Sequence, residues 1–378
     1  MRILHTSDWH LGKFLGGVSL LADQLHALQQ LAGLLRSEPH DLLVIAGDVF
    51  DHATPTAESV RVLGSWLAEL RLVTPTLPIL IIAGNHDNGP RLAWTASLLD
   101  QQGIYLRGEL AGIDTPIEVV GADGVAAQVW ALPFLAAGAL GEQAPTQVAA
   151  MTEALQRIRT AQQAGKAQVL VAHCFVQNAQ TSDSERSLIG AASQIDVASF
   201  AGFDYVALGH LHRAQAPAPH VHYSGSIARY SFSEATHGKM CLSVEVKPGT
   251  PCAVTEKPLR QLRGMQRITA NLEALLDDPG YTPLLGDWVE LTLEPPVVVG
   301  NPLEALRRRW QHILSFHNEL PPIVASLVAS PTAGDGPRDL EADFQQFNRL
   351  VTGEDSPPVD VMAAFRSLHQ QLPPEVAP

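Results

Sequence analysis

Residues 205–212 read YVALGHLH, an apolar run that ends in a glycine and two histidines separated by one residue. Continuous apolar runs of this kind are typical of strands that are buried on both faces. Side chains two residues apart on an extended segment point to the same side, so His210 and His212 are expected together at the strand end. Two imidazoles placed this way predict a metal site whose remaining ligands come from other parts of the chain.

The N-terminal part of the chain alternates short apolar runs with longer amphipathic stretches. The runs are RILHTSD (2–8), DLLVIAGD (41–48) and PILIIAGNHD (78–87), separated by LLADQLHALQQLAGLLRSE (20–38) and SVRVLGSWLAELR (59–71). This alternation predicts parallel strands joined by helices, as at the start of an α/β fold. Polar residues follow each run, and AQVLVAHCF (167–175) repeats the pattern with His173. Because ligands in such sheets bind beyond the carboxyl ends of the strands, these polar groups are expected to converge.

The strand ends supply a candidate set of metal ligands that combines carboxylates, an amide and imidazoles. The set is Asp8, His10, Asp48, Asn85, His173, His210 and His212. A set without thiolates suits hard or borderline divalent metals. Each motif alone has an ordinary interpretation, as surface polarity, a turn or a core histidine. Their combination favours a dinuclear site, and the glycines before Asp48, Asn85 and His210 fit a backbone that turns sharply beside it.

The motifs resemble those of the calcineurin-like metallophosphoesterases and, within that superfamily, those of the SbcD family of nucleases. The segments that carry the resemblance are HTSDWHLGK (5–13), VIAGDVFDHATPT (44–56), IAGNHD (82–87), VAHCFV (171–176), ALGHLHRAQ (207–215) and YSGSIARYSFSE (223–234). The resemblance implies an α/β fold of two packed mixed sheets flanked by helices. It also implies a small α+β capping domain and C-terminal helices after the catalytic domain.

The resemblance further implies how the ligands divide between two divalent ions, with Mn²⁺ preferred. Asp8, His10, Asp48 and His212 would hold one ion, while Asp48, Asn85, His173 and His210 would hold the other, so that Asp48 bridges them. The implied function is a DNA nuclease of double-strand break repair and recombination, with 3′–5′ exonuclease action on double-stranded DNA and endonuclease action on single strands. The implied partners are DNA, an SbcC-like ABC-type ATPase with a coiled coil, and a second copy of the chain, as a homodimer within a heterotetramer.

Three further residues are candidates for acting on the substrate. His86 follows Asn85 and is assigned to no metal, so it is the candidate general acid for the leaving oxygen. Asp87 would orient or charge-stabilise that imidazole, with a plain turn aspartate as the alternative. Archaeal and eukaryotic relatives carry a histidine directly after the Phe of the second motif, where this chain has Asp51, with His52 one place later. His52, which stands one residue later than the histidine of those relatives, is the candidate for substrate binding.

Composition limits the possible functions. The formal net charge of −14 argues against a general nucleic-acid coat, because non-specific DNA affinity comes mostly from Lys and Arg. A dinuclear pocket is locally positive whatever the net charge, so both a nuclease and a metallophosphodiesterase or phosphatase of small phosphate esters remain compatible. Three cysteines without metal-type spacing favour a reducing compartment. Without a signal-peptide core or a run of roughly 18 apolar residues, we expect a cytoplasmic protein and no membrane contact.

The chain is expected to have more than one domain, because 378 residues exceed the roughly 250 to 300 of a single core. We predict a catalytic domain over 1–262, a capping domain over 263–330, and a linker with a helical partner-binding segment over 331–378. In that segment, DLEADFQQFNRLVTG (339–353) and PVDVMAAFRSLHQQL (358–372) have apolar residues at helical spacing. Those residues are Leu340, Phe344, Phe347, Leu350, Val361, Phe365 and Leu368. They would bury against the partner's coiled coil or, alternatively, against this protein's own core.

Overall fold

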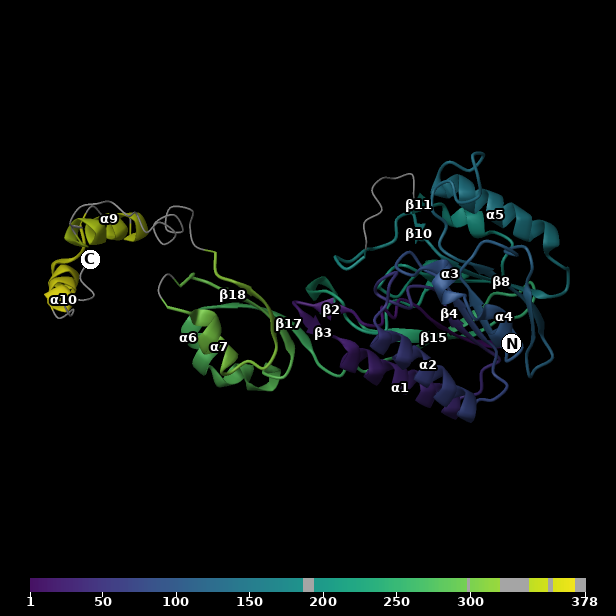
Figure 1. Ribbon diagram of the computed structural model, residues 1–378, viewed down its shortest axis with the longest axis horizontal. Coiled ribbons are helices and arrows are strands. Elements are labelled where there is room, and N and C mark those ends of the chain that lie inside the picture. Colours follow the sequence, from purple (N-terminus) through teal and green to yellow (C-terminus); the bar gives the residue numbers. More distant parts are fainter. Residues whose placement is uncertain (186–193, 298–299, 320–339, 353–355, 371–378) are drawn as a thin grey trace. The chain divides into compact units, whose positions relative to one another are not determined.

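The computed structural model describes residues 1–185, 194–297, 300–319, 340–352 and 356–370. The chain divides into two compact units, which can be followed by their colours in Figure 1. The first unit comprises Met1–Arg267 and Gly286–Val289, and the second comprises Ile268–Leu285 and Glu290–Pro378. The linker SPTAGDGP (330–337) and the predicted boundary within it lie outside the described residues, and the three-part division stays a prediction.

The first unit contains two six-stranded sheets, of which one has the order β16-β15-β1-β4-β5-β6. Its strands are β1 (Arg2–Thr6), β4 (Leu42–Ile45), β5 (Ile79–Ile82), β6 (Ile104–Arg107), β15 (Met240–Glu245) and β16 (Ala253–Pro258). The strands β1, β4, β5 and β6 run parallel, whereas β15 and β16 are antiparallel to their neighbours. The apolar runs predicted as buried strands therefore form the parallel part of this sheet.

The second sheet of this unit has the order β13-β14-β12-β9-β8-β7. Its strands are β7 (Ile117–Val120), β8 (Ala126–Leu132), β9 (Ala167–His173), β12 (Tyr205–Gly209), β13 (Gln215–Ala218) and β14 (Val221–Tyr223). The four inner strands are parallel, and the two edge strands β7 and β13 are antiparallel to their neighbours. Both sheets are thus mixed, with a parallel core.

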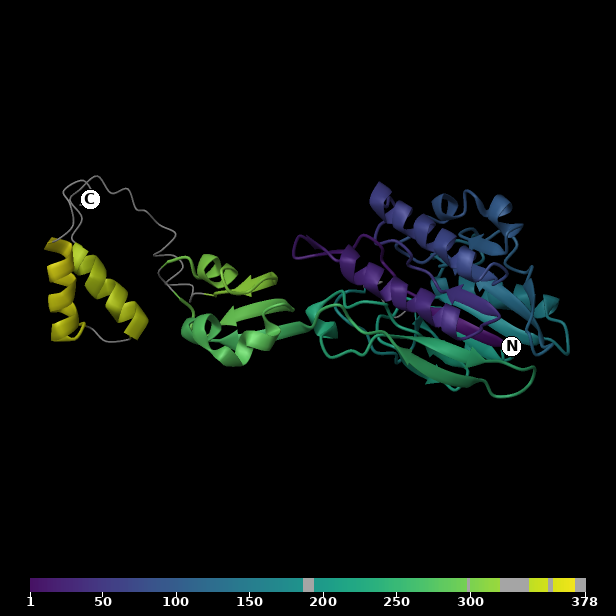
Figure 2. The same ribbon diagram turned by 90° about the horizontal axis from the view of Figure 1, so that it is seen from below.

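Helices cover the outer faces of the two sheets. The helices α1 (Leu21–Ser37) and α2 (Ala57–Val73), side by side in Figures 1 and 2, pack on the first sheet, and α5 (Gln147–Ala161) packs on the second. Successive side chains along a strand point to opposite faces. In β4, Leu42 therefore belongs to the core between the sheets, whereas Leu43 belongs to the core beneath α1 and α2. The predicted fold of two packed mixed sheets flanked by helices is confirmed.

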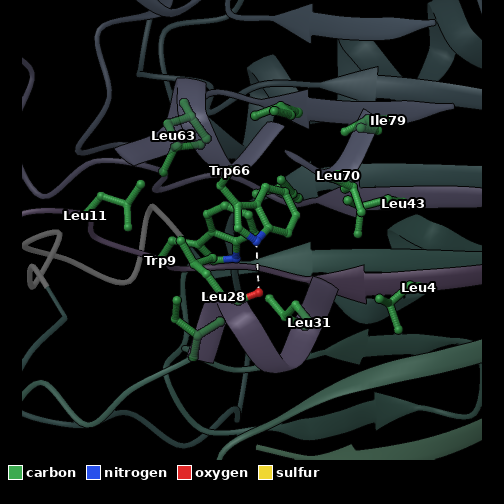
Figure 3. Close-up of a cluster of buried hydrophobic side chains, with 14 of the residues drawn as sticks. Leu4, Trp9, Leu11, Leu28, Leu31, Leu43, Leu63, Trp66, Leu70 and Ile79 are labelled. Carbon is green, nitrogen blue, oxygen red and sulfur yellow. Dashed lines mark hydrogen bonds between the residues drawn. The ribbon is translucent and has the colours of Figure 1, made fainter. Parts of the chain in front are cut away.

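The helix layer over the first sheet also anchors the loop that follows β1. Trp9 is fully buried, and its ring lies edge to face against the ring of Trp66 on α2, with 5.0 Å between centroids (Figure 3). Trp66 Nε1 donates a hydrogen bond to the carbonyl oxygen of Leu28 on α1 at 2.8 Å. Trp9 Nε1 donates to Thr6 Oγ1 at 3.0 Å. The residue between Asp8 and His10 is therefore fixed in the hydrophobic core.

Shorter elements complete the first unit. They are β2 (Phe14–Leu15), β3 (Val18–Ser19), α3 (Gly89–Leu92), α4 (Ala96–Asp100), β10 (Phe175–Val176), β11 (Gln194–Ile195), and the 3₁₀ helices Val197–Phe200 and Phe232–Glu234. The long helices α2 and α5 begin at side-chain caps. Thr56 accepts a hydrogen bond from the N–H of Ser59 at the start of α2, and Thr146 accepts one from the N–H of Ala149 at the start of α5.

The second unit combines strands and short helices, as the expected α+β capping domain does. A three-stranded sheet has the order β17 (Met265–Ala270), β18 (Trp288–Leu293) and β19 (Ile313–His317), and its first two strands start in the first unit. The accompanying helices are α6 (Leu272–Asp277), α7 (Pro302–Arg307) and the 3₁₀ helix Pro279–Leu284. Buried Trp310 donates from Nε1 to the carbonyl oxygen of Leu275 at 2.9 Å, which ties the end of α7 to α6. The apolar run IVASLVAS (323–330) lies outside the described residues.

The two helices expected at the C-terminal end are α9 (Leu340–Thr352) and α10 (Val359–Gln370). They pack on each other through Phe344 and Phe365, whose rings stack with 4.2 Å between centroids, and through an ion pair between Arg366 and Glu341. Leu368 is 66% exposed, so the pair buries only part of its predicted apolar face. The side chain of Leu350 lies outside the described residues. In the described ranges, no helix combines the length and the apolar character needed to cross a bilayer.

Candidate metal centre

All seven predicted ligands lie at the carboxyl ends of strands. Those from the first sheet are Asp8 and His10 after β1, Asp48 after β4 and Asn85 after β5; those from the second are His173 at the end of β9, and His210 and His212 after β12. The two sheets pack face to face, so these ends share one edge of the sandwich. The structure brings the seven residues into a single connected cluster, which we call the strand-end cluster.

Three members of the strand-end cluster form a first group. One ligand atom from each of Asp8, His10 and His212 lies within 4.8 Å of the others. The Nε2 atoms of His10 and His212 face each other at 3.0 Å. The backbone N–H of His210 donates to the Asp8 carboxylate at 2.9 Å, which joins the ends of β12 and β1.

A second group gathers around the amide oxygen of Asn85. That oxygen lies 3.0 Å from His173 Nε2 and 2.8 Å from His210 Nδ1. Asp48 stands between the two groups, because its Oδ2 is 3.4 Å from His173 Nε2 and 3.6 Å from His10 Nε2. The central position of Asp48 is the arrangement that a bridging carboxylate requires.

The backbone at the strand-end cluster is held in a conformation that few residues adopt. Among the described residues, positive φ angles occur at five positions other than glycine, and four of these are predicted ligands. The four are Asp8 (φ 52°), His10 (44°), Asp48 (49°) and His210 (108°). Strained backbone of this kind persists only where the surrounding structure imposes it, and it concentrates at functional sites.

Three glycines let the strand ends approach one another closely. A Cβ atom on Gly84 would lie 2.1 Å from Asp48 Oδ1, and one on Gly47 would lie 2.4 Å from His173 Nδ1. A Cβ on Gly209 would lie 1.9 Å from the carbonyl oxygen of Ala46. These are the glycines before Asn85, Asp48 and His210, so the expectation that the backbone needs them beside a crowded site is confirmed.

Burial and neighbouring charges move the pKa values of the cluster in different directions. Burial, with the nearby charge of Asp48 in addition, raises the pKa of Asp8 to about 7. Burial alone would lower the pKa of His173, but the neighbouring Asp48 carboxylate outweighs it and raises that pKa to about 9. Burial lowers the pKa of His210 to about 3. Bound cations are commonly the largest charges in such a site, and one placed here would stabilise the carboxylates and the neutral imidazoles together.

The predicted acid, His86, lies beside this cluster, with a ring nitrogen within 4.8 Å of donor atoms of His10 and Asp48. Its Nδ1 donates to the backbone carbonyl oxygen of Asp51 at 2.8 Å, and its backbone N–H donates to Asp48 Oδ1 at 2.8 Å. Its ring lies edge to face against that of His10, with 4.6 Å between centroids. His86 is 4% exposed, so the imidazole is fixed next to the ligands by its neighbours.

Asp87 binds backbone groups of the two loops that carry Asp48 and Asn85. Its carboxylate accepts hydrogen bonds from the backbone N–H groups of Val49, Phe50 and Gly84, at 2.9 to 3.0 Å. These bonds tie the loop after β4 to the loop after β5. The His86 ring is oriented by the hydrogen bond that its Nδ1 donates to the backbone carbonyl oxygen of Asp51.

His52 is 67% exposed, unlike the ligands, and its Nε2 lies 3.2 Å from Asp51 Oδ2. Asp51 itself is buried and also accepts a hydrogen bond from Lys13 Nζ at 2.9 Å. Its Oδ1 lies 3.4 Å from His10 Nδ1. Hydrogen bonding to His10 and the charge of Lys13 hold the pKa of Asp51 well below its usual range despite burial, so it stays ionised.

The sequence motifs gave no role to three residues that contact a ligand from outside the cluster, namely Glu234, Lys239 and Asp51. Glu234 is fully buried and accepts a hydrogen bond from His212 Nδ1 at 3.1 Å, and Lys239 is paired with Glu234 at 2.5 Å. Glu234 falls in the segment YSGSIARYSFSE, whose resemblance to the family was the only available signal. For Asp51, the available signal in the sequence was that archaeal and eukaryotic relatives carry a histidine at this position.

Comparison with known proteins identifies the family. A profile of the calcineurin-like phosphoesterases matches residues 1–214. The chain belongs to the calcineurin-like phosphoesterase family. A curated relative from Staphylococcus epidermidis, the SbcD component of the nuclease SbcCD, is 33% identical over 325 residues, covering 84% of this chain and 85% of that protein. The predicted resemblance to SbcD is confirmed.

Among solved structures, a dimetal phosphatase from Danio rerio gives a TM-score of 0.44 at 12% identity, covering 69% of this chain and 97% of that one. That similarity is too weak to bear on fold or function. As a calcineurin-like phosphoesterase, the chain is a metal-dependent hydrolase of phosphate esters, and its family is dinuclear.

The residues of the strand-end cluster fit a pair of divalent metal ions. The strand-end cluster offers buried carboxylate and imidazole donors and the half-buried amide of Asn85, with Asp48 between its two groups. Nδ1 of His212 faces Ser184 Oγ at 2.7 Å and Glu234 Oε1 at 3.1 Å, and with its proton shared with these oxygens Nε2 carries the lone pair that faces His10. Nδ1 of His10, on the far side of the ring from His212, lies 3.4 Å from Asp51 Oδ1, so a carboxylate stands beside the second nitrogen of this imidazole as well.

Proposed function

We propose that this protein is a dinuclear, Mn²⁺-dependent DNA nuclease that acts with an SbcC-like ATPase in double-strand break repair and recombination, inside the cytoplasm. The observation that carries the proposal is the central position of Asp48, whose carboxylate lies within 3.6 Å of imidazoles from both groups of the strand-end cluster. The proposed activities are 3′–5′ exonuclease action on double-stranded DNA and endonuclease action on single strands. Both activities rest on family resemblance.

The relative supports a nuclease rather than an enzyme of small phosphate esters. Its alignment of 325 residues is longer than the 214-residue match to the catalytic family, so the similarity continues beyond the phosphoesterase domain. That relative is named as one component of a nuclease complex. An enzyme that hydrolyses small esters would not need the second unit or the C-terminal helices.

We assign one ion to Asp8, His10, Asp48 and His212 and the other to Asp48, Asn85, His173 and His210. When bound, two such ions lower the pKa of a water nucleophile and neutralise charge that develops on the phosphate oxygens. The oxygen and nitrogen donors, with no thiolate among them, are compatible with Mn²⁺.

The remaining steps fall to side chains around the cluster. We assign His86 as the general acid that protonates the leaving sugar oxygen, because its Nδ1 is anchored on the carbonyl of Asp51 and its ring lies against His10. Asp87 would act by positioning, since it fixes the backbone of the loop next to Asp48. Exposed His52, beside Asp51, would contact the DNA backbone.

We assign α9 and α10 as the docking segment for the coiled coil of the ATPase. Leu368 and Val359 stay 66% and 88% exposed after the two helices have packed on each other, which leaves apolar surface for a partner helix. The ATPase would also supply DNA-binding surface that a chain with a net charge of −14 lacks. The proposed homodimer within a heterotetramer rests on family resemblance.

The discriminating experiment compares two substrates in the presence of Mn²⁺. The nuclease proposal expects degradation of linear duplex DNA labelled at either 3′ end, stopped by chelator and by Asp48→Asn, with the label released first as mononucleotide. The alternative, a metallophosphodiesterase or phosphatase of small esters, expects hydrolysis of a chromogenic phosphodiester while DNA stays intact even with the ATPase present. The second result would overturn the proposal.

Docking is tested by co-purification with the ATPase. The full chain is expected to co-purify with it, and a chain that lacks residues 338–378 is expected to lose the ATPase while it keeps hydrolysis of the chromogenic ester. If the shortened chain retained the ATPase, the docking surface would lie elsewhere.

A further inference from the structure

His212 is held differently from His173 and His86. The ring Nδ1 atoms of His173 and His86 donate to backbone carbonyl oxygens, those of Ala46 and Asp51. The Nδ1 of His212 instead lies against two side chains, with Ser184 Oγ at 2.7 Å and Glu234 Oε1 at 3.1 Å, and the Ser184 hydroxyl itself donates to Glu234. His212 and Glu234 are buried, with exposed fractions of 1% and 0%.

Glu234 keeps its charge in the interior because its partners are arranged around both oxygens. Oε2 accepts from Lys239 Nζ at 2.5 Å, while Oε1 accepts from His212 and from the Ser184 hydroxyl. The Lys239 cation holds the pKa of Glu234 below its usual range against the opposing effect of burial. A buried ion pair of this kind contributes little net stability, so its presence calls for another role.

Lys239 uses all of its hydrogen-bond donors within this small region. Besides Glu234, its ammonium donates to the carbonyl oxygen of His212 at 2.9 Å and to Ser226 Oγ at 2.8 Å. The backbone N–H of His212 donates to Glu185 Oε1 at 2.8 Å. The ring and both main-chain polar groups of His212 are thus fixed by buried or partly buried side chains, and Nε2 is left pointing at the first group of ligands.

We propose that Glu234 and Lys239 are positioning residues that make the ion position of Asp8, His10 and His212 the tighter of the two. A carboxylate that accepts the far N–H of a ligand imidazole fixes its tautomer and ring orientation and increases its basicity at the metal. The other position relies on the neutral amide of Asn85 and on imidazoles held by backbone carbonyls or by Asn85 itself. This inference rests on the metal roles given under the proposed function.

The test measures Mn²⁺ binding by isothermal titration calorimetry on metal-free full-length protein, together with its melting temperature without metal. The wild-type protein should bind two ions with unequal affinity. Glu234→Gln should weaken the tighter ion by roughly 10- to 100-fold, the usual cost of removing such a partner, and leave the weaker ion within about threefold.

Two further variants separate positioning from a structural role. Glu234→Gln leaves the Lys239 ammonium buried without a counter-charge, which lowers the melting temperature. The double variant Glu234→Gln/Lys239→Met removes that charge, so it should recover melting temperature without recovering the affinity of the tighter ion. The matched control is Asp23→Asn, which breaks another buried ion pair, with Arg263 at 2.6 Å. It should lower the melting temperature and leave both affinities unchanged.

The outcomes are distinct. If the wild-type chain binds no Mn²⁺, the proposed function fails, whatever Glu234 does. If the wild type binds two ions and Glu234→Gln binds them with the same affinities, the positioning role is wrong. The same conclusion follows if affinity returns in the double variant in step with its melting temperature, because Glu234 would then serve the fold alone.

Discussion

At the residue scale, the site depends on backbone geometry as much as on ligand chemistry. Four predicted ligands have positive φ angles, and three glycines stand where a Cβ atom would collide with a ligand or its neighbour. The glycine pattern was visible in the sequence. The strained ligands were not, because Asp and His adopt ordinary conformations elsewhere and only the tertiary structure imposes the left-handed one.

Gly84 offers a sharp test of this geometry. In Gly84→Ala the new methyl group would lie 2.1 Å from Asp48 Oδ1 and 2.3 Å from its backbone nitrogen, so Asp48 must move and Mn²⁺ affinity should fall more than tenfold. The matched control is Gly33→Ala in α1, where nothing lies within 4 Å of the added atom. The control should stabilise the fold by about 0.5–1 kcal/mol and leave metal binding unchanged. Normal calorimetric titration of Gly84→Ala would contradict this account.

The proposed acid is tested by His86→Ala. This change removes an imidazole that contacts the ligands through its ring and backbone and to which the proposal assigns no ion. Loss of a general acid typically lowers the rate by about 10²–10⁴-fold. Hydrolysis of DNA should fall by that factor while the titration still counts two Mn²⁺ ions. Activity within a few-fold of wild type would show that another group donates the proton.

At the element scale, the central strands and long helices could be predicted because they carry strong periodic signals. Runs such as LLVIAG and ILIIAG became β4 and β5, and the amphipathic stretches between them became α1 and α2. The antiparallel edge strand β16 gave a weaker pattern, because its side chains are all exposed or half-buried. That the strands form two separate sheets came from the family resemblance, since periodicity does not say which strands pair.

The roles of the polar residues Glu234 and Asp51, which contact ligands, could not be predicted because no periodic pattern marks them. Glu234 sits in a one-turn 3₁₀ helix and Asp51 in a loop, where single charged residues are usually exposed. Their roles depend on partners far away in sequence, such as His212 for Glu234 and His10 for Asp51. A sequence pattern has no access to such contacts.

Packing between elements supports the site through Trp66, whose ring holds the ring of Trp9 between two ligands. Trp66→Ala should lower the free energy of unfolding by about 3–5 kcal/mol, the usual cost of removing a buried aromatic ring. Leu72→Ala on the same helix, where the side chain is 83% exposed, should change it by less than about 0.5 kcal/mol. Urea denaturation measures both. Equal effects of the two changes would mean that Trp66 does not hold this interface.

At the scale of the whole molecule, the core between the sheets predicts sensitivity to acid. His5 is fully buried there, with Nδ1 2.8 Å from the Tyr205 hydroxyl. Burial lowers the pKa of His5 to about 3, from about 6.5 in an unfolded chain. Because the unfolded chain binds the proton more tightly, stability is full above pH 6.5 and falls as the pH drops toward 3.

The lowered pKa of His5 gives a measurable slope of the free energy of unfolding against pH. Between pH 7 and pH 5, His5 alone should remove about 2 kcal/mol from the free energy of unfolding. In His5→Gln that share of the loss should disappear, while His26→Gln, on the outer helix α1, should keep the wild-type slope. Urea denaturation at the two pH values measures it. An unchanged slope in His5→Gln would show that other groups cause the acid sensitivity.

The central claim is that the strand-end cluster holds two ions that share Asp48, and electron paramagnetic resonance of Mn²⁺ bound to the metal-free protein tests it most directly. At two equivalents per chain, the wild type should give the spectrum of a magnetically coupled pair, and Asp48→Asn should give only separate, uncoupled ions. A wild-type protein that binds a single ion, or an Asp48→Asn variant that keeps the coupled pair, would contradict the account.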